Sequence, residues 1–327
     1  MRFSPLVLAI LLCCVETTAH AAGLKFIDIP ADAEGPALSG AAWYPCARPP
    51  GQVELRSIVV VPAVKDCSVA GTKLPLVVMS HGKAGWYGGN HDTAEALADA
   101  GFVVAAINHP GDTLSDSTRV WDLSVLFDRP ADIKRLIDHM TRAWPDHARI
   151  DSENVGFFGF SRGGYTGLIV LGGIPDLPHA AALCVDEPGL PFCGQLRSPE
   201  LPTYAPVHDP RIKAAVLADP AFRMFFSDDS LNTVKTPVQL WASERGCDGV
   251  SLDLVEATRE NLPVPPDFHL VHAGHFAFVA PCSPEQAAAT PMFCIDPDGF
   301  DRVAFHKEFN TTVLKFLREH LVGANGQ

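Results

Sequence analysis

Short runs of consecutive apolar residues recur along the chain and alternate with stretches in which apolar residues have helical spacing. Residues 76–79 form one such run, 102–107 and 155–160 form others, and 212–217 and 238–242 are apolar apart from Lys213 and Gln239. A strand that is apolar along its whole length is covered on both faces, as in a parallel sheet between two layers of helices. The pattern predicts an α/β fold with a mostly parallel central sheet of about eight strands and helices on both faces.

The intervening segments complete this expectation. Further strands are expected over residues 24–29, 37–44, 52–62 and 268–271. Helices are expected over residues 90–100, from 128 to the proline at 145, from 163 onward, over 252–262, and near the C-terminus, where Phe305, Phe309, Val313, Phe316 and Leu317 form one apolar stripe. Residues 171–210 are rich in proline and break the alternation. We expect them to form an irregular excursion of the same domain.

The N-terminal segment resembles a secretory signal peptide. Arg2 precedes an apolar run, Leu6 to Val15, which is followed by Ala19-His20-Ala21. A basic start, a short apolar core and a small-residue cleavage site are typical of such signals, and a membrane-spanning helix needs a longer run of ~20 residues. We therefore expect residues 1–21 to be cleaved, residues 22–327 to form one secreted or periplasmic domain, and no stable membrane insertion.

Export would place the cysteines in an oxidising compartment. Two of the nine cysteines, Cys13 and Cys14, lie in the signal segment, which leaves seven. Near neighbours in sequence are expected to pair there. The expected disulfides are Cys46–Cys67, Cys184–Cys193 and Cys282–Cys294, with Cys247 left unpaired. No C-x-x-C or H-E-x-x-H motif occurs, so the sequence predicts no metal site.

The charge of the chain argues against one class of partner. The formal net charge is −13, and no cluster of lysine and arginine occurs. An acidic surface repels the phosphate backbone of nucleic acids. We therefore expect a small molecule, and no nucleic acid, as the partner.

A G-x-S-x-G sequence, Gly159 to Gly163, lies between the run at 155–160 and the helix expected after it. In a sharp strand-to-helix turn, glycines two residues either side of the serine leave no Cβ to collide, and the serine oxygen lies exposed at a helix N-terminus. The same motif also occurs in turns where the serine only caps the helix. The position between strand and helix favours Ser161 as a nucleophile.

A nucleophilic serine in this setting needs a base and an acid, in the chain order serine, acid, histidine. His275 directly follows the last expected strand and is the predicted general base, with His272 as the alternative. His81 and His109 follow strands upstream of the serine, so we expect them to shape the pocket or hold loops.

Three carboxylates compete for the role of the acid. Asp248 and Glu244 follow the strand at 238–242, and Asp219 follows the strand at 212–217. A third group must hold the imidazole and stabilise its charged form. We choose Asp248 and keep Asp219 and Glu244 as alternatives.

Backbone amides near the serine are expected to form an oxyanion hole. One is the amide of Arg162, which follows the nucleophile, and the other comes from the loop after the strand at 76–79, where Lys83 or Ala84 would donate. We choose Lys83. Trp86 and Tyr87 lie in the same loop and are expected to line the substrate pocket.

From about Leu74 to Leu321 the sequence resembles the α/β-hydrolase superfamily. Within it, the chain is most similar to exported serine esterases of the dienelactone hydrolase type, relatives of platelet-activating-factor acetylhydrolases and of some polyesterases. The strings that carry the resemblance are Ser80-His81-Gly82, Asn108-His109-Pro110-Gly111, Arg129-Pro130-Ala131-Asp132, Gly159–Gly164, Gly274-His275-Phe276 and Gly299-Phe300-Asp301-Arg302.

The chain also departs from these relatives. Dienelactone hydrolases use a cysteine nucleophile where this chain has Ser161, and relatives often carry histidine at the position of Phe160. The resemblance implies that acetylhydrolase relatives take their acid from the strand that ends near Asp219, and polyesterase-like relatives from the strand before Asp248.

Together these residues predict hydrolysis of a small or lipid-like carboxylic ester through an acyl-enzyme, with no metal or organic cofactor. Two alternatives remain open. One is an amidase or peptidase that uses the same residues, and the other is a catalytically silent α/β-hydrolase fold that only binds.

Overall fold

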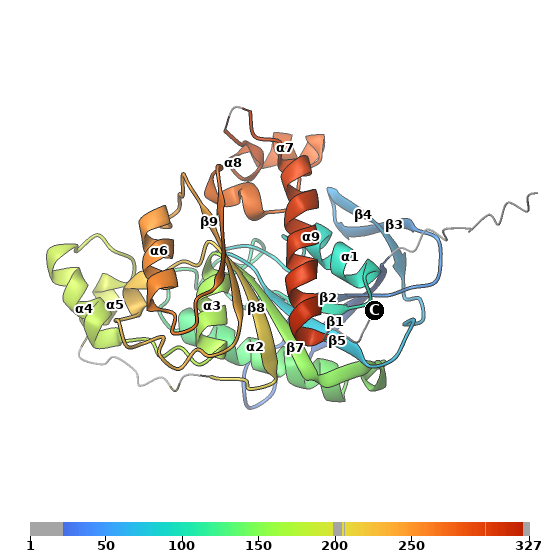
Figure 1. Ribbon diagram of the computed structural model, residues 1–327, viewed down its shortest axis with the longest axis horizontal. Coiled ribbons are helices and arrows are strands. Elements are labelled where there is room, and N and C mark those ends of the chain that lie inside the picture. Colours follow the sequence, from blue (N-terminus) through green and yellow to red (C-terminus); the bar gives the residue numbers. More distant parts are fainter. Residues whose placement is uncertain (1–21, 199–204, 206, 298, 323–327) are drawn as a thin grey trace, which may run out of the picture.

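The computed structural model describes residues 22–198, 205, 207–297 and 299–322, and the predicted signal peptide lies outside them. Within these residues, ten strands form one sheet in the order β10-β9-β8-β7-β5-β6-β2-β1-β4-β3 (Figure 1). The strands are β1 (Gly23–Ile29), β2 (Leu38–Tyr44), β3 (Gly51–Arg56), β4 (Val59–Lys65), β5 (Leu74–Ser80), β6 (Val103–Ile107), β7 (Ile150–Phe160), β8 (Ile212–Ala218), β9 (Val238–Ser243) and β10 (Asp267–Val271).

Strands β5 to β10 are mutually parallel, and antiparallel pairing is confined to the N-terminal strands. β5 pairs in parallel with β6 and β7, and parallel pairing continues through β8 and β9 to β10. β2 pairs antiparallel with both β1 and β6, and β3 pairs antiparallel with β4. The predicted mostly parallel α/β sheet is confirmed.

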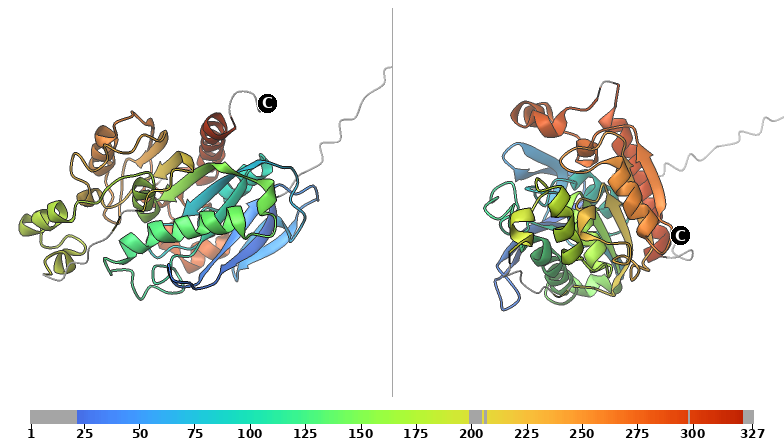
Figure 2. Two further views of the ribbon diagram at one scale, coloured as in Figure 1. Left: turned by 90° about the horizontal axis from the view of Figure 1, so that it is seen from below. Right: turned by 90° about the vertical axis from the view of Figure 1, so that its left-hand side faces the viewer.

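Helices cover both faces of the sheet. Helices α2 (Val125–Arg142), α3 (Arg162–Val170) and α6 (Leu252–Asn261) lie on one face, and α1 (His91–Asp99) and α9 (Arg302–Leu321) lie on the other. The left view of Figure 2 shows α2 crossing the sheet on the face opposite α9. Each face therefore has its own apolar core.

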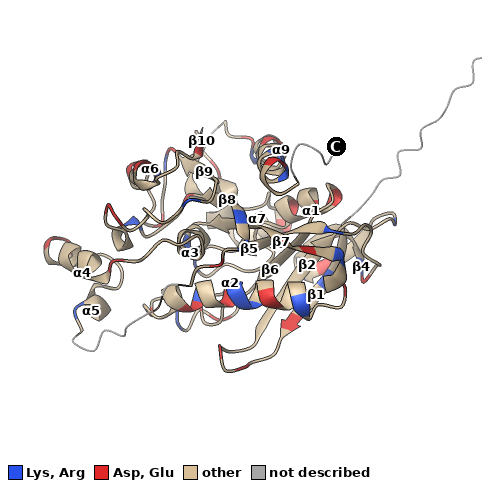
Figure 3. Cartoon of the chain, turned by 60° about the horizontal axis from the view of Figure 1, so that its bottom comes forward, with Lys and Arg blue, Asp and Glu red and all other residues tan. Residues whose placement is uncertain are grey.

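The two cores explain why the central strands are apolar throughout. Along β5, Leu76 and Val78 belong to the core under α2 and α3, whereas Val77 and Met79 belong to the core under α1 and α9. Successive side chains of a strand point to opposite faces, so neither face of this strand meets water. Strands β5, β6 and β9 accordingly carry no charged residue (Figure 3).

Three sequence expectations need correction. The single strand expected over 52–62 is the hairpin of β3 and β4. Helix α2 begins at Val125, before the expected start at 128, because Val125 and Leu126 are buried and extend the helix past Pro130. The irregular segment at 171–210 contains α4 (Leu177–Asp186) and α5 (Cys193–Leu196), since the proline in the first turn of α4 is tolerated there.

The expected disulfides are present in the structure. Cys46 is bonded to Cys67, Cys184 to Cys193 and Cys282 to Cys294, and Cys247 is an exposed free cysteine. Cys184–Cys193 joins α4 to α5. None of the helices in the described part of the chain is both long and apolar enough to cross a bilayer.

Candidate active site

A cavity of about 340 Å³ opens at the carboxyl ends of the parallel strands. Its lining includes the loops after β5, β7, β9 and β10 and the hairpin between β3 and β4, and both Ser161 and His275 contribute to it. Segments far apart in sequence meet here because parallel strands all end at the same edge of a sheet, where α/β proteins bind their ligands.

Ser161 occupies a strained turn between β7 and α3. Its φ is 55°, a left-handed conformation that is unfavourable for a residue with a side chain. A Cβ at Gly163 would collide with the carbonyl oxygen of Ser80, and a Cβ at Gly159 would collide with that of Gly163. The Ser161 amide donates to Ala218 O at 2.9 Å. The two glycines allow the close approach that fixes this turn.

His275 is held by Asp219. Its Nδ1 lies 2.9 Å from Asp219 Oδ2, and both side chains are almost fully buried, at 1% and 0% exposure. The Ser243 amide donates to Asp219 Oδ1 at 2.7 Å, and the Ser243 hydroxyl donates to Oδ2. These contacts fix the carboxylate, which in turn orients the imidazole ring.

The other ring nitrogen of His275 is Nε2. Within the described residues, Nε2 is buried and has no hydrogen-bond partner. The ring packs against Phe160, with 4.7 Å between ring centroids, and so lies beside the turn that carries Ser161.

The structure brings Asp219 to His275, and not the chosen acid Asp248. Asp248 forms an ion pair with Lys83 and lies in a turn beyond the end of β9. Asp219 directly follows β8, the neighbour of β7 in the sheet. Glu244 pairs instead with His272 at 3.1 Å, and both of these side chains are exposed. The alternative base and the third candidate acid therefore lie together at the surface, away from the buried pair.

Of the two residues expected to supply oxyanion amides, Arg162 directly follows Ser161 and Lys83 lines the cavity. Arg162 is the first residue of α3, so its amide has no intrahelical partner. The amide of Ala84, the other candidate donor in this loop, is already engaged, because it donates to Asp112 Oδ1 at 2.9 Å.

Of the two aromatic residues expected to line the pocket, Trp86 does so and Tyr87 is not among the lining residues. The Tyr87 hydroxyl donates to Leu55 O at 3.0 Å, and its ring packs against Trp43. Tyr87 thus secures the β3–β4 hairpin.

A cluster of three buried charged residues lies next to the strand-to-helix turn at Ser161, which we call the elbow. The sequence analysis did not select these residues. Asp112 Oδ2 accepts from Arg129 Nη1 at 2.6 Å and from Arg162 Nη1 at 2.8 Å, with all three side chains fully buried. Asp112 also accepts the Ala84 amide, as noted above. One carboxylate thus links the loop after β5 to the first turn of α3. Burial raises the pKa of Asp112, but the charges of Arg129 and Arg162 outweigh burial and lower it.

His81 and His109 extend this cluster as neutral groups. Burial, reinforced by the Arg129 charge, lowers the pKa of His81 to about 3. Burial likewise lowers the pKa of His109, whose Nε2 lies 3.0 Å from Ser80 Oγ and whose Nδ1 lies 3.0 Å from Asp132 Oδ2. Burial raises the pKa of Asp132 to about 7. His81 lines the cavity and His109 holds the strand ends from behind, in line with the roles expected of them.

The sequence model of the family described as Serine aminopeptidase, S33, matches residues 72–244, more than half of the chain. The chain belongs to this family. Its matched region contains Ser161 and Asp219, while His275 lies beyond it. The match and the sheet described above identify an α/β-hydrolase fold. The match does not extend to the dienelactone hydrolase type suggested by the sequence.

Solved structures agree on the fold of this S33-family protein. A ferulic acid esterase from Streptomyces cinnamoneus superimposes with a TM-score of 0.60 at 18% identity, over 94% of this chain and 92% of that chain. At this identity the likeness concerns the fold alone. No curated protein sequence matches the chain.

Replacing Gly163 should destabilise this S33-family protein. In Gly163→Ala the new methyl group collides with backbone at Ser80, and overpacking of this kind costs about 1–3 kcal/mol or more. Urea unfolding followed by fluorescence measures the change. Gly194→Ala is the matched control, because no atom lies within 4 Å of a Cβ built there. Equal midpoints for the two variants would contradict the prediction.

Removing the charge of Asp112 should destabilise the protein much more than removing that of Asp248. Asp112→Asn leaves two buried guanidinium groups without a carboxylate, and breaking a buried pair costs about 3–5 kcal/mol. Asp248→Asn breaks a partly exposed pair, where the loss is about 1 kcal/mol or less. Denaturant unfolding of both variants checks this, and similar losses would be inconsistent with a structural role for Asp112.

Proposed function

We propose that this protein is a serine esterase with Ser161 as nucleophile, His275 as general base and Asp219 as the acid that orients it. The observation that carries the proposal is the buried hydrogen bond between His275 Nδ1 and Asp219 Oδ2, beside a cavity that Ser161 also lines. A carboxylate on Nδ1 holds the proton there, so that Nε2 is the basic nitrogen.

The proposed reaction follows from these positions. His275 Nε2 removes the Ser161 proton as the hydroxyl attacks the ester carbonyl, and then protonates the departing alkoxide. The amides of Lys83 and Arg162 donate to the oxyanion. Water then attacks the acyl-enzyme by the same route. Hydrogen bonds of this kind often close only when substrate is bound.

The charge cluster behind the elbow supports this assignment. Two guanidinium groups share one carboxylate, which leaves an excess of positive charge beneath the turn. In a buried setting, such charge favours the negative charge that develops on the substrate oxygen. The cluster also supports the elbow mechanically, because Asp112 contacts both flanking segments.

The lining of the cavity favours an ester over the N-terminus of a peptide. An α-ammonium group calls for an unpaired carboxylate, and the one carboxylate among the lining residues, Asp248, is already paired with Lys83. The ferulic acid esterase with this fold also acts on an ester, as its name says. A purely binding scaffold would have no use for the strained turn and the oriented imidazole.

We extend the proposal to the type of esterase and its compartment. The position of Asp219 after β8 favours the acetylhydrolase-like relatives within the dienelactone hydrolase type over the polyesterases. The domain, residues 22–327, is proposed to be exported after loss of residues 1–21. Its three disulfides are compatible with an oxidising compartment.

A fluorophosphonate should label this protein at one residue. The reagent mimics the tetrahedral intermediate and reacts with an activated serine, so mass spectrometry of tryptic peptides should find the adduct on Ser161. Ser161→Ala should remove both the adduct and all ester turnover. If the folded protein stays unlabelled, the result favours the alternative of a catalytically silent fold that only binds. Turnover of an amide at a rate equal to that of the matched ester would favour a peptidase.

Replacing the two candidate acids should separate them. Asp219→Asn no longer holds the reactive tautomer of His275, and kcat should fall by about 10³-fold or more at neutral pH. Asp248→Asn removes only the ion pair with Lys83, so kcat should stay within about tenfold. Steady-state kinetics with p-nitrophenyl acetate provide the measurement. A larger loss in Asp248→Asn than in Asp219→Asn would reverse the assignment.

A further inference from the structure

One wall of the cavity is a small separate segment, residues 281–297, which we name the cap. It contains α7 (Pro284–Ala289) and α8 (Pro291–Cys294), and Figure 1 shows both helices beyond the end of α9. No residue of the cap is fully buried. The cap therefore has no core of its own and depends on specific attachments for its position.

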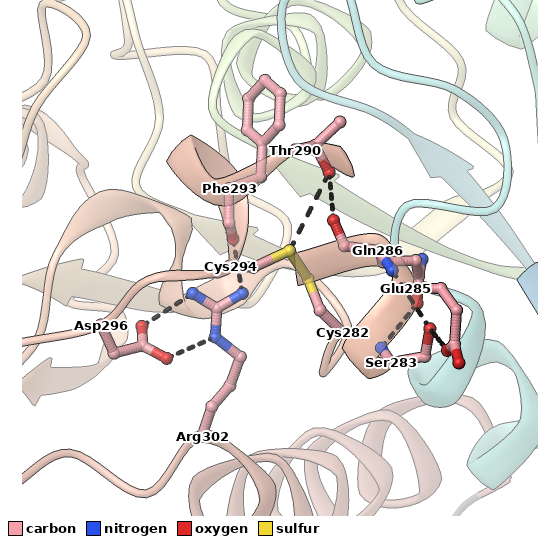
Figure 4. The surroundings of a disulfide bond; sticks show 9 residues. All are labelled: Cys282, Ser283, Glu285, Gln286, Thr290, Phe293, Cys294, Asp296 and Arg302. Atoms are coloured by element: carbon pink, nitrogen blue, oxygen red, sulfur yellow. Dashed lines mark hydrogen bonds and ion pairs between the residues drawn. A yellow bond between two sulfur atoms is a disulfide. The ribbon is translucent and has the colours of Figure 1, made fainter. Parts of the chain in front are cut away.

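A disulfide within the cap fixes its shape and an arginine of α9 fixes its position, and Figure 4 shows both. The disulfide Cys282–Cys294 closes the segment into a loop. Arg302, in the first turn of α9, donates from Nε and Nη2 to the Asp296 carboxylate at 2.8 and 2.7 Å, and from Nη1 to Phe293 O at 2.7 Å. A bidentate guanidinium contact restricts direction as well as distance. The backbone at Phe293 is thus held by a residue of the main domain.

The Phe293 side chain lines the cavity. Its ring packs edge-on against Phe276, next to His275 in sequence, with 4.9 Å between centroids. The hairpin between β3 and β4 contributes Ile58 to the lining, and Trp86 adds a further aromatic surface. The polar cap residues bond within the cap: Thr290 Oγ1 donates to Gln286 O at 3.0 Å, and the Ser283 amide donates to Gln286 Oε1 at 2.8 Å. The cap contributes no charged residue to the lining.

The size of the cavity sets what it can hold. A cavity of about 150 Å³ lined by apolar side chains binds one benzene molecule. At about 340 Å³, this cavity has room for an aromatic ring beside the ester group, and a small ester such as ethyl acetate would leave most of it unfilled.

We propose that Phe293, positioned by Arg302 and the Cys282–Cys294 disulfide, determines specificity for esters that carry an aromatic ring. This inference rests on the proposed esterase function and adds its substrate class. In this proposal Phe293 contacts the ring of the substrate and makes no contact with the reacting carbonyl. Its contribution is therefore uniform binding, which changes KM and leaves kcat unaltered.

The test compares ethyl acetate, ethyl benzoate and phenyl acetate, with acid release followed by pH-stat titration. The two aromatic esters place the ring on the acyl and on the alcohol side in turn. In Phe293→Ala we expect KM to rise about tenfold or more for at least one aromatic ester, with kcat unchanged and ethyl acetate hydrolysed within about twofold of the wild-type rate. Met292→Ala is the matched control, because Met292 lies on the same short helix, is 68% exposed and is not a lining residue.

Two further variants test the same inference without replacing Phe293. Ala289→Phe adds bulk to the cavity wall at an exposed position and should also raise KM for the same aromatic ester. Removal of the cap disulfide by Cys282→Ser with Cys294→Ser should reproduce the Phe293→Ala pattern. Removal of Cys184–Cys193, which lies outside the lining, should not.

Failure of this inference is distinguishable from failure of the esterase proposal. If the wild type hydrolyses none of the three esters, or Ser161→Ala hydrolyses them equally well, the esterase proposal is wrong. If the wild type is active but Phe293→Ala leaves KM unchanged for both aromatic esters, or slows ethyl acetate by the same factor, only the specificity role of Phe293 is overturned.

Discussion

The turn at Ser161 depends on contacts that leave no room for a side chain on either flanking glycine. The α-carbon of Gly163 lies against the carbonyl of Ser80, the last residue of β5, so α3 starts directly above the neighbouring strand. This contact forces the left-handed backbone at Ser161 and directs its side chain toward the cavity. Such strain persists only where the surroundings determine it fully. Here the surroundings are the central strands and the charges packed behind them.

Burying these charged side chains is energetically unfavourable, and other interactions in the fold must offset that cost. Burying Arg129 and Arg162 beside a single carboxylate is unfavourable unless each remaining donor finds an acceptor. Arg129 also donates to Ser80 Oγ and His81 O, and Arg162 donates to Val120 O, but Arg129 Nε and Arg162 Nε and Nη2 are buried with no hydrogen-bond partner among the described residues. An apolar filling of equal volume would be as stable or more so. We therefore interpret the cluster as a means of holding two loops in one relative position, next to the amides expected to bind an oxyanion.

The sequence predicted the architecture well because each main signal is local. A continuous apolar run such as 76–79 is typical of a strand that is buried on both faces. The glycines at 159 and 163 allow close approach of backbone that lies directly beside them. The antiparallel hairpin at 51–65 was missed, since a Val-rich stretch does not show where it reverses. For a similar reason, the carboxylate that contacts His275 differs from the one chosen. The order of the loops along the chain leaves several candidate carboxylates. Which of them contacts His275 depends on the order of the strands in the sheet, where β8 lies next to β7 and β9 does not. One local signal favoured Asp219: it follows a buried strand with no intervening residue, so its carboxylate needs a buried partner.

Burial separates the proposed catalytic residues from the cap that lines the cavity. Asp219, His275 and Asp112 are almost wholly enclosed, and each bonds to groups on other elements, so a change at any one of them disturbs the fold as well as the reaction. The cap is the reverse case. It buries no residue fully, its disulfide is internal, and Arg302 of α9 holds it to the domain. Substitutions in the cap therefore cost little stability while they change the walls of the cavity. This arrangement lets a rigid elbow serve different substrates through changes in a segment that the core does not need.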